Sequence, residues 1–208
     1  MRRRAGLDLR PVAALALAHG VFTTVAVVLA GLGADDRVAA SVLLPATLLL
    51  LALAVALNSV LRLEGLTDDG LPAAAGVLGA ALAVLGRAYL TVRQSAPISG
   101  GDGAESWALI AFARVEVAGF LLTGAWAAHA GWSVHRLLAR ASVFGWGCIA
   151  TGVLAAGLAG GLLLRGGGDV TPAGPAAALV RGPVAAFSFI LAVAAWLGQP
   201  PRANLPSE

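Results

Sequence analysis

The chain has 208 residues, of which 59% are hydrophobic and only 12% are charged. Its mean hydropathy of +0.86 excludes an ordinary soluble globular domain and identifies a membrane protein. All 14 basic residues are Arg, and most lie at the ends of apolar segments. Arg in these positions orients a membrane protein, so we expect no nucleic-acid partner. The bias toward Ala, Gly, Leu and Val suggests a GC-rich, bacterial genome.

Six apolar segments have the length of about 20 residues that a helix needs to cross a bilayer. The connectors between them are short and rich in Gly, Pro or charged residues. We therefore expect an all-α polytopic membrane protein, in which residues 1–208 form a single bundle of six transmembrane helices without a soluble domain. The predicted helices are 11–32, 41–63, 72–92, 107–130, 142–164 and 176–197.

The first segment follows a basic stretch and has the general appearance of a signal peptide. Its apolar run of roughly 20 residues is longer than the about 7 to 15 of a signal sequence, so we expect an uncleaved first helix. Three prolines, Pro11, Pro45 and Pro72, are expected at or near helix starts, where a missing N–H costs little.

The connector RLEGLTDDGLP follows the second segment and contains Glu64, Asp68 and Asp69. Clustered carboxylates can hold Mg²⁺ against a diphosphate substrate. The stretch resembles the acidic motifs of membrane-bound CDP-alcohol phosphotransferases and of cobalamin synthases. However, the Ala-Arg pair after the first Asp-Gly is absent and no second acidic pair follows, so we assign the chain to neither family. The simpler interpretation is a solvated turn that caps the next helix.

Ionisable side chains inside a bilayer cost several kcal/mol unless they are paired or hydrated, so they are the best functional candidates in this sequence. Arg87, Arg114 and Arg181 lie on three different segments, each about 8 to 10 Å from the outer surface at a rise of about 1.5 Å per residue. Glu116 lies slightly deeper on the same segment as Arg114. These four residues form the predicted ligand-binding site.

Arg114 and Glu116 are two residues apart, about 200° around a helix, and therefore cannot pair with each other. We predict that Arg87 pairs with Glu116 instead. In one interpretation this pair is a structural lock that fixes the register of the helices. In the other, the three Arg side chains line an outward-facing pocket for an anionic solute or a lipid headgroup, with Glu116 as a gate or proton carrier.

A second group of polar residues is expected toward the cytoplasm and comprises His19, Asn58 and His129. Two His residues on separate helices could ligate a haem, but their expected depths differ and packing roles are the simpler interpretation. Cys148 is the only cysteine, which leaves no intramolecular disulfide and no cysteine-based metal site. We predict no resident cofactor or metal.

The distribution of Arg predicts the orientation of the helices. Eight Arg lie on the side of the termini and the second and fourth connectors, and three lie in the loops of the other side. Both termini are therefore expected in the cytoplasm, with the protein in the cell inner (cytoplasmic) membrane.

The functions expected from these features are transport of a small anionic solute or lipid, or a role as membrane subunit of a larger complex. An enzyme acting on lipid or isoprenoid phosphates is an alternative, as is a protein that binds haem b. Membrane lipids are expected partners, and the glycine-rich fifth segment fits either intramolecular packing or a homo- or hetero-oligomer.

Overall fold

In the hydrocarbon core of a bilayer, backbone N–H and C=O groups must be paired within the protein, and a helix pairs them within one segment. The computed structural model describes residues 8–33, 35–66, 70–95, 103–137, 142–165 and 175–198, and no strand occurs within these ranges. The helices are α1 (Arg10–Gly31), α2 (Asp36–Leu63), α3 (Gly70–Ser95), α4 (Gly103–Leu137), α5 (Ser142–Arg165) and α6 (Pro175–Leu197).

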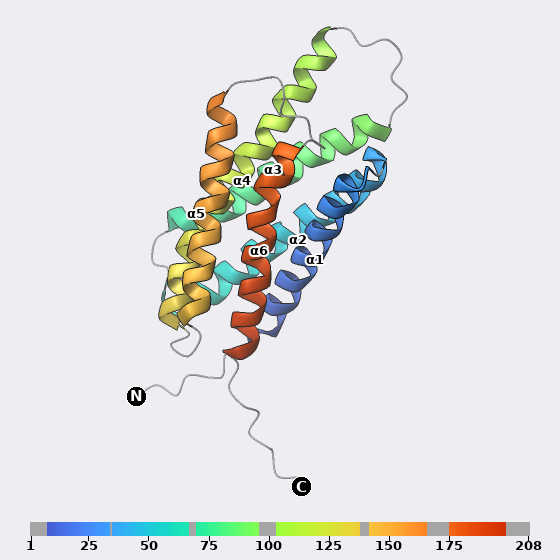
Figure 1. The fold of residues 1–208 in the computed structure, drawn as a ribbon. Coiled ribbons are helices and arrows are strands. Elements are labelled where there is room, and N and C mark those ends of the chain that lie inside the picture. The colour runs from blue at the N-terminus through green and yellow to red at the C-terminus, as the bar shows by residue number, and fades with distance from the viewer. Residues whose placement is uncertain are drawn as a thin grey trace, which may run out of the picture.

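All six helices are long and apolar enough to cross a membrane, which confirms the predicted all-α fold class. Helix α1 begins and helix α6 ends at the same end of the bundle (Figure 1). The protein is therefore a multi-pass helical bundle whose helices could span a membrane. The described helices cross it an even number of times.

Three helices are longer than predicted by five residues or more: α2, α4 and α3, which spans Gly70–Ser95 rather than 72–92. Helix α2 begins at Asp36 rather than at residue 41, because a carboxylate oxygen of Asp35 accepts a hydrogen bond from the Arg37 N–H at 2.9 Å and caps the first turn. Pro45 consequently lies inside α2 and not near its start, which corrects the prediction. Because proline lacks an N–H, it removes one helical hydrogen bond at this position.

Helix α4 continues seven residues beyond the predicted end at residue 130 and includes part of the predicted connector. The added turns are held by aromatic contacts. The Trp132 ring lies 5.8 Å from the ring of His135 and 6.1 Å from that of Trp146 on α5, measured between centroids. Contact between these partly exposed rings of α4 and α5 favours a continued helix over a loop.

The helices are arranged as a ring in chain order. Each helix packs against the next one along the chain, and α6 packs against α1 to close the ring. Helix α4 also contacts α6 across the ring. Side chains near the middle of α4 therefore lie among α3, α5 and α6, which is where a buried polar group can find partners on several helices.

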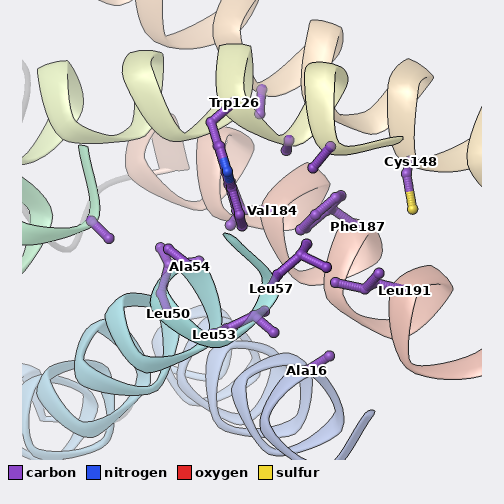
Figure 2. Close-up of a cluster of buried hydrophobic side chains, with 14 of the residues drawn as sticks. Ala16, Leu50, Leu53, Ala54, Leu57, Trp126, Cys148, Val184, Phe187 and Leu191 are labelled. Carbon is purple, nitrogen blue, oxygen red and sulfur yellow. The ribbon is translucent and has the colours of Figure 1, made fainter. Parts of the chain in front are cut away.

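The inside of the ring is filled by side chains from several helices, as Figure 2 shows. Trp126 of α4 is 1% exposed and meets Phe187 of α6 edge-on, with 5.8 Å between ring centroids. Its indole Nε1–H donates to Asn58 Oδ1 at 2.9 Å, and Asn58 Nδ2 donates to the Ala73 carbonyl oxygen at 3.0 Å. Asn58 thus connects α2 with α3 and α4. Cys148 is buried in the same core.

Close contact between α3, α4 and α5 depends on glycine. A Cβ atom at Gly119 would lie 2.5 Å from the backbone N of Ala83 and 2.6 Å from the carbonyl oxygen of Gly79. A Cβ atom at Gly124 would lie 2.6 Å from the backbone N of Ala156 on α5. Small residues permit such close approach of helix backbones in membranes. The position of α4 relative to its two neighbours is therefore set by backbone contact.

Substitution of Gly119 tests this packing. Gly119→Ala is expected to destabilise the protein by about 1 to 3 kcal/mol, because the new methyl group would overlap backbone atoms that cannot move away as a side chain can. Gly157→Ala is the matched control, since nothing lies within 4 Å of a Cβ built at Gly157. Unfolding of the purified protein in detergent, followed by circular dichroism, measures both. Equal stability of the two variants would contradict the packing described.

Candidate functional site

Glu116 lies near the middle of α4 on the side that faces α3 and α6. Arg87 of α3 donates to its carboxylate through Nε at 3.2 Å from Oε1 and through Nη2 at 2.8 Å from Oε1 and 2.5 Å from Oε2. The predicted Arg87–Glu116 ion pair is therefore confirmed. The contact uses two guanidinium nitrogens and both carboxylate oxygens, a geometry that favours Arg over Lys.

Arg181 of α6 binds the same carboxylate. Its Nη2 donates to Glu116 Oε1 at 2.9 Å. Arg87, Glu116 and Arg181 are 1%, 3% and 5% exposed. These three residues, called the triad below, join α3, α4 and α6 through one buried carboxylate.

Two local features bring Arg87 within reach of Glu116. Gly86 lies against the backbone of Phe112 and Glu116, and any Cβ there would come within 2.8 Å of α4 atoms. The rings of Tyr89 and Phe112 stack at 3.9 Å between centroids with an angle of 13°. Phe112 is about one turn nearer than Glu116, and Tyr89 about half a turn nearer than Arg87, to the end predicted to face outward.

Arg114 does not join the triad. It is exposed on the surface of α4, whereas Glu116 is buried two residues later. The separation of about 200° around the helix predicts this difference. Of the four predicted site residues, the structure brings together Arg87, Glu116 and Arg181 and places Arg114 on another face.

Burial of the three charged side chains of the triad has a cost in free energy. Removing a charged group from water costs several kcal/mol, and attraction to a partner offsets this cost only when the geometry is good and the hydrogen bonds are satisfied. Among the residues that the structure describes, two guanidinium groups face one carboxylate. A carboxylate in this position is the common partner on which the placement of both cations depends.

A small cavity of about 10 Å³ adjoins Arg181 on the side away from α3. This is the volume that a single water molecule needs. The cavity is lined by His19, Thr23, Thr47 and Arg181, together with apolar residues of α2, α4 and α6, and the surface that these residues present to it is apolar. Lone hydroxyl residues in apolar helices carry no sequence pattern, so Thr23 and Thr47 were not predicted from the sequence, whereas His19 and Arg181 were singled out there.

His19 is buried and uses both ring nitrogens. Ser188 Oγ lies 2.7 Å from Nδ1, and Thr23 Oγ1 lies 3.2 Å from Nε2. Ser188 donates to the Val184 carbonyl oxygen at 3.2 Å, so its oxygen accepts from the His19 Nδ1–H, and Nε2 accepts from Thr23. Neither nitrogen is available to an iron atom in this arrangement.

The predicted second polar group is not brought together. Asn58 binds Trp126 and Ala73, while His19 binds Thr23 and Ser188. His129 lies in the C-terminal part of α4. Its Nε2 is buried without a hydrogen-bond partner among the described residues. A haem held by His19 and His129 remains a hypothesis that the absorption spectrum of the purified protein tests.

Two of the three residues in the acidic connector, Asp68 and Asp69, lie outside the described residues. Glu64 directly follows α2 and is half-buried. Within the described ranges, no group of three or more His, Cys, Asp or Glu side chains has the spacing of a metal site.

Comparisons of this chain with models of protein families, with curated proteins and with solved structures gave no match.

Replacement of Glu116 tests the role of the triad in stability. Glu116→Gln is expected to destabilise the protein by about 3 to 5 kcal/mol, because it removes the negative charge between two buried guanidinium groups. The half-buried Glu64 at the end of α2 provides the matched control, and Glu64→Gln is expected to change stability by less than about 0.5 kcal/mol. Reversible unfolding in mixed micelles measures both values. A Glu116→Gln variant as stable as the control would show that the triad does not hold the helices together.

Proposed function

We propose that the protein takes part in the transport of a small anion across the membrane, with Arg87 and Arg181 as the anion-binding groups. The observation that supports this proposal is the shared carboxylate of Glu116. Two guanidinium groups from different helices hold it at 2.5 to 3.2 Å inside the membrane-spanning region. A pair of Arg side chains that binds an internal carboxylate has the chemistry needed to bind a carboxylate or phosphate ligand.

In this proposal Glu116 acts as the gate. Its carboxylate occupies the place that the ligand would take, and release of the ligand returns Glu116 to the two Arg residues. The triad is at most 5% exposed, so the described conformation corresponds to the closed state. Opening would require α6 to move relative to α3 and α4. Alternating access of this kind occurs by movement of helices around a site in the membrane.

A second candidate function is a membrane subunit of a larger complex, in which the triad is only a structural lock. The burial of all three charged side chains favours this candidate, because a lock needs no opening. Helix α5 is also the least covered by its own chain, with 22% of its span buried compared with 39% to 61% for the other helices. The expected outward-facing cavity at the triad would be absent in such a subunit.

The location that we propose is the cytoplasmic membrane of a bacterium, with both termini in the cytoplasm. The excess of Arg on the side of the termini supports this orientation. An enzyme acting on lipid or isoprenoid phosphates would require Glu64, Asp68 and Asp69 to face one groove, and this remains an alternative hypothesis.

Small carboxylates provide the test of anion binding. Glu116→Ala leaves a space between Arg87 and Arg181, and formate or acetate is expected to fill it and to restore part of the lost thermal stability. The same salts should leave the wild-type protein and the Glu64→Ala variant unchanged. Thermal unfolding with chloride at equal ionic strength as reference measures the effect.

Flux measurements then separate the two candidate functions. Wild-type protein in proteoliposomes is expected to carry a small carboxylate, phosphate or chloride faster than protein-free liposomes, and Arg181→Gln is expected to abolish this flux. Absence of flux for all three classes of anion would reject transport and leave the membrane-subunit function.

A further inference from the structure

A groove of about 200 Å³ lies between α2 and α3, far from the triad. It is lined by Val55, Asn58, Ser59 and Arg62 of α2 and by Ala73, Ala74 and Val77 of α3. The groove lies at the end of the bundle where α2 ends and α3 begins, which the Arg distribution predicts to be the cytoplasmic side. It is separate from the triad and from the cavity beside Arg181, and it includes Asn58 of the predicted second polar group.

The lining residues of α2 follow one face of the helix. From Arg62 in the last turn, the groove passes Ser59 and reaches Val55, seven residues or about 10 Å toward the bilayer centre. The walls contributed by α3 are small and apolar. The groove thus has a cation at the membrane surface and an apolar wall that extends into the hydrocarbon region.

The floor of the groove is held in place by the hydrogen bonds of Asn58. Its side chain binds the Ala73 carbonyl oxygen on α3 and the Trp126 indole on α4, so both walls are fixed to α4. A preformed groove binds a ligand without the entropic cost of ordering its own walls. Ser59 donates its hydroxyl to the Val55 carbonyl oxygen at 2.8 Å, which leaves its oxygen as an acceptor at the groove.

We propose that this groove binds one anionic phospholipid of the cytoplasmic leaflet, with the lipid phosphate on Arg62 and the upper part of an acyl chain between α2 and α3. Three observations support this occupant: the Arg at the headgroup level, the apolar walls below it, and the absence of an acidic side chain among the lining residues that the structure describes, a set that does not extend to Asp68 and Asp69. The positive end of the α3 dipole lies at the same mouth, because α3 begins at Gly70.

Glu64 does not oppose this binding from within the groove. It is two residues beyond Arg62, on a different side of the chain, and it is not a lining residue. Attraction of one Arg to an anionic membrane lipid at the surface corresponds to about a fivefold change in affinity. The proposal therefore predicts a measurable but moderate preference for anionic lipid.

Native mass spectrometry of the detergent-purified full chain, titrated with phosphatidylglycerol and with phosphatidylcholine, tests the proposal. The first bound phosphatidylglycerol is expected to bind about fivefold more tightly than phosphatidylcholine. Arg62→Gln is expected to abolish this preference, while Arg136→Gln, an exposed Arg in the last turn of α4, leaves it unchanged. Millimolar glycerol phosphate should not displace the lipid, because it lacks the acyl chain.

Ala74→Phe provides a second variant that keeps Arg62. Ala74 is exposed on α3 and lines the groove, so a phenyl ring there fills the space for the acyl chain without entering the protein core. Loss of tight phosphatidylglycerol binding in this variant, with thermal stability unchanged, supports the proposal. Equal binding by wild type, Arg62→Gln and Ala74→Phe would overturn it, as would displacement of the lipid by free glycerol phosphate, which would indicate a phosphate site without a lipid groove.

Discussion

The carboxylate of Glu116 is the constraint on which the arrangement of α3, α4 and α6 depends. Removing charged groups from water costs several kcal/mol, and a negative partner inside the protein offsets this cost for the buried Arg87 and Arg181. One carboxylate serves both, at distances of 2.5 to 3.2 Å. The side chains of the triad reach one another only when α3, α4 and α6 each keep a fixed depth in the bilayer and a fixed rotation about the helix axis.

The remaining packing is consistent with this constraint. The glycine contact between Gly86 and Glu116 brings α3 close enough for Arg87 to bind, and Gly119 continues the same contact deeper in the bundle. On the opposite side of α4, Gly124 approaches α5. Helix α4 is thus fixed on two sides by backbone contact and on a third side by the ion pair with α6. The same contacts would position two guanidinium groups for an anion if Glu116 moved away.

Much of this arrangement could be predicted from the sequence. Length and hydropathy predict the six helices, because a membrane-spanning segment needs little beyond about 20 apolar residues. Helical geometry predicts that Arg114 and Glu116 point to opposite sides, and depth predicts Arg87 as a partner of Glu116. The early start of α2 at Asp36 was missed because capping by Asp35 depends on the local turn, and Pro45 was misplaced for the same reason.

The contact of Arg181 with the carboxylate could not be predicted in this way. Arg181 shares the expected depth of Arg87, but only the rotation of α6 relative to α4 decides whether its side chain reaches Glu116. That rotation follows from side-chain packing between helices far apart in sequence, such as the contact of Trp126 with Phe187. The hydrogen bond of His19 with Ser188 on α6 was missed for the same reason. Pairing between distant helices leaves no periodic signal in either segment.

The most direct test of the shared carboxylate is a double-mutant cycle between Arg87 and Glu116. Stability would be measured by reversible unfolding for wild type, Arg87→Gln, Glu116→Gln and the double variant. A buried hydrogen-bonded ion pair predicts a coupling free energy of about 1 to 3 kcal/mol. Effects that add within about 0.5 kcal/mol would contradict the contact and with it the account of how α3 and α4 are joined.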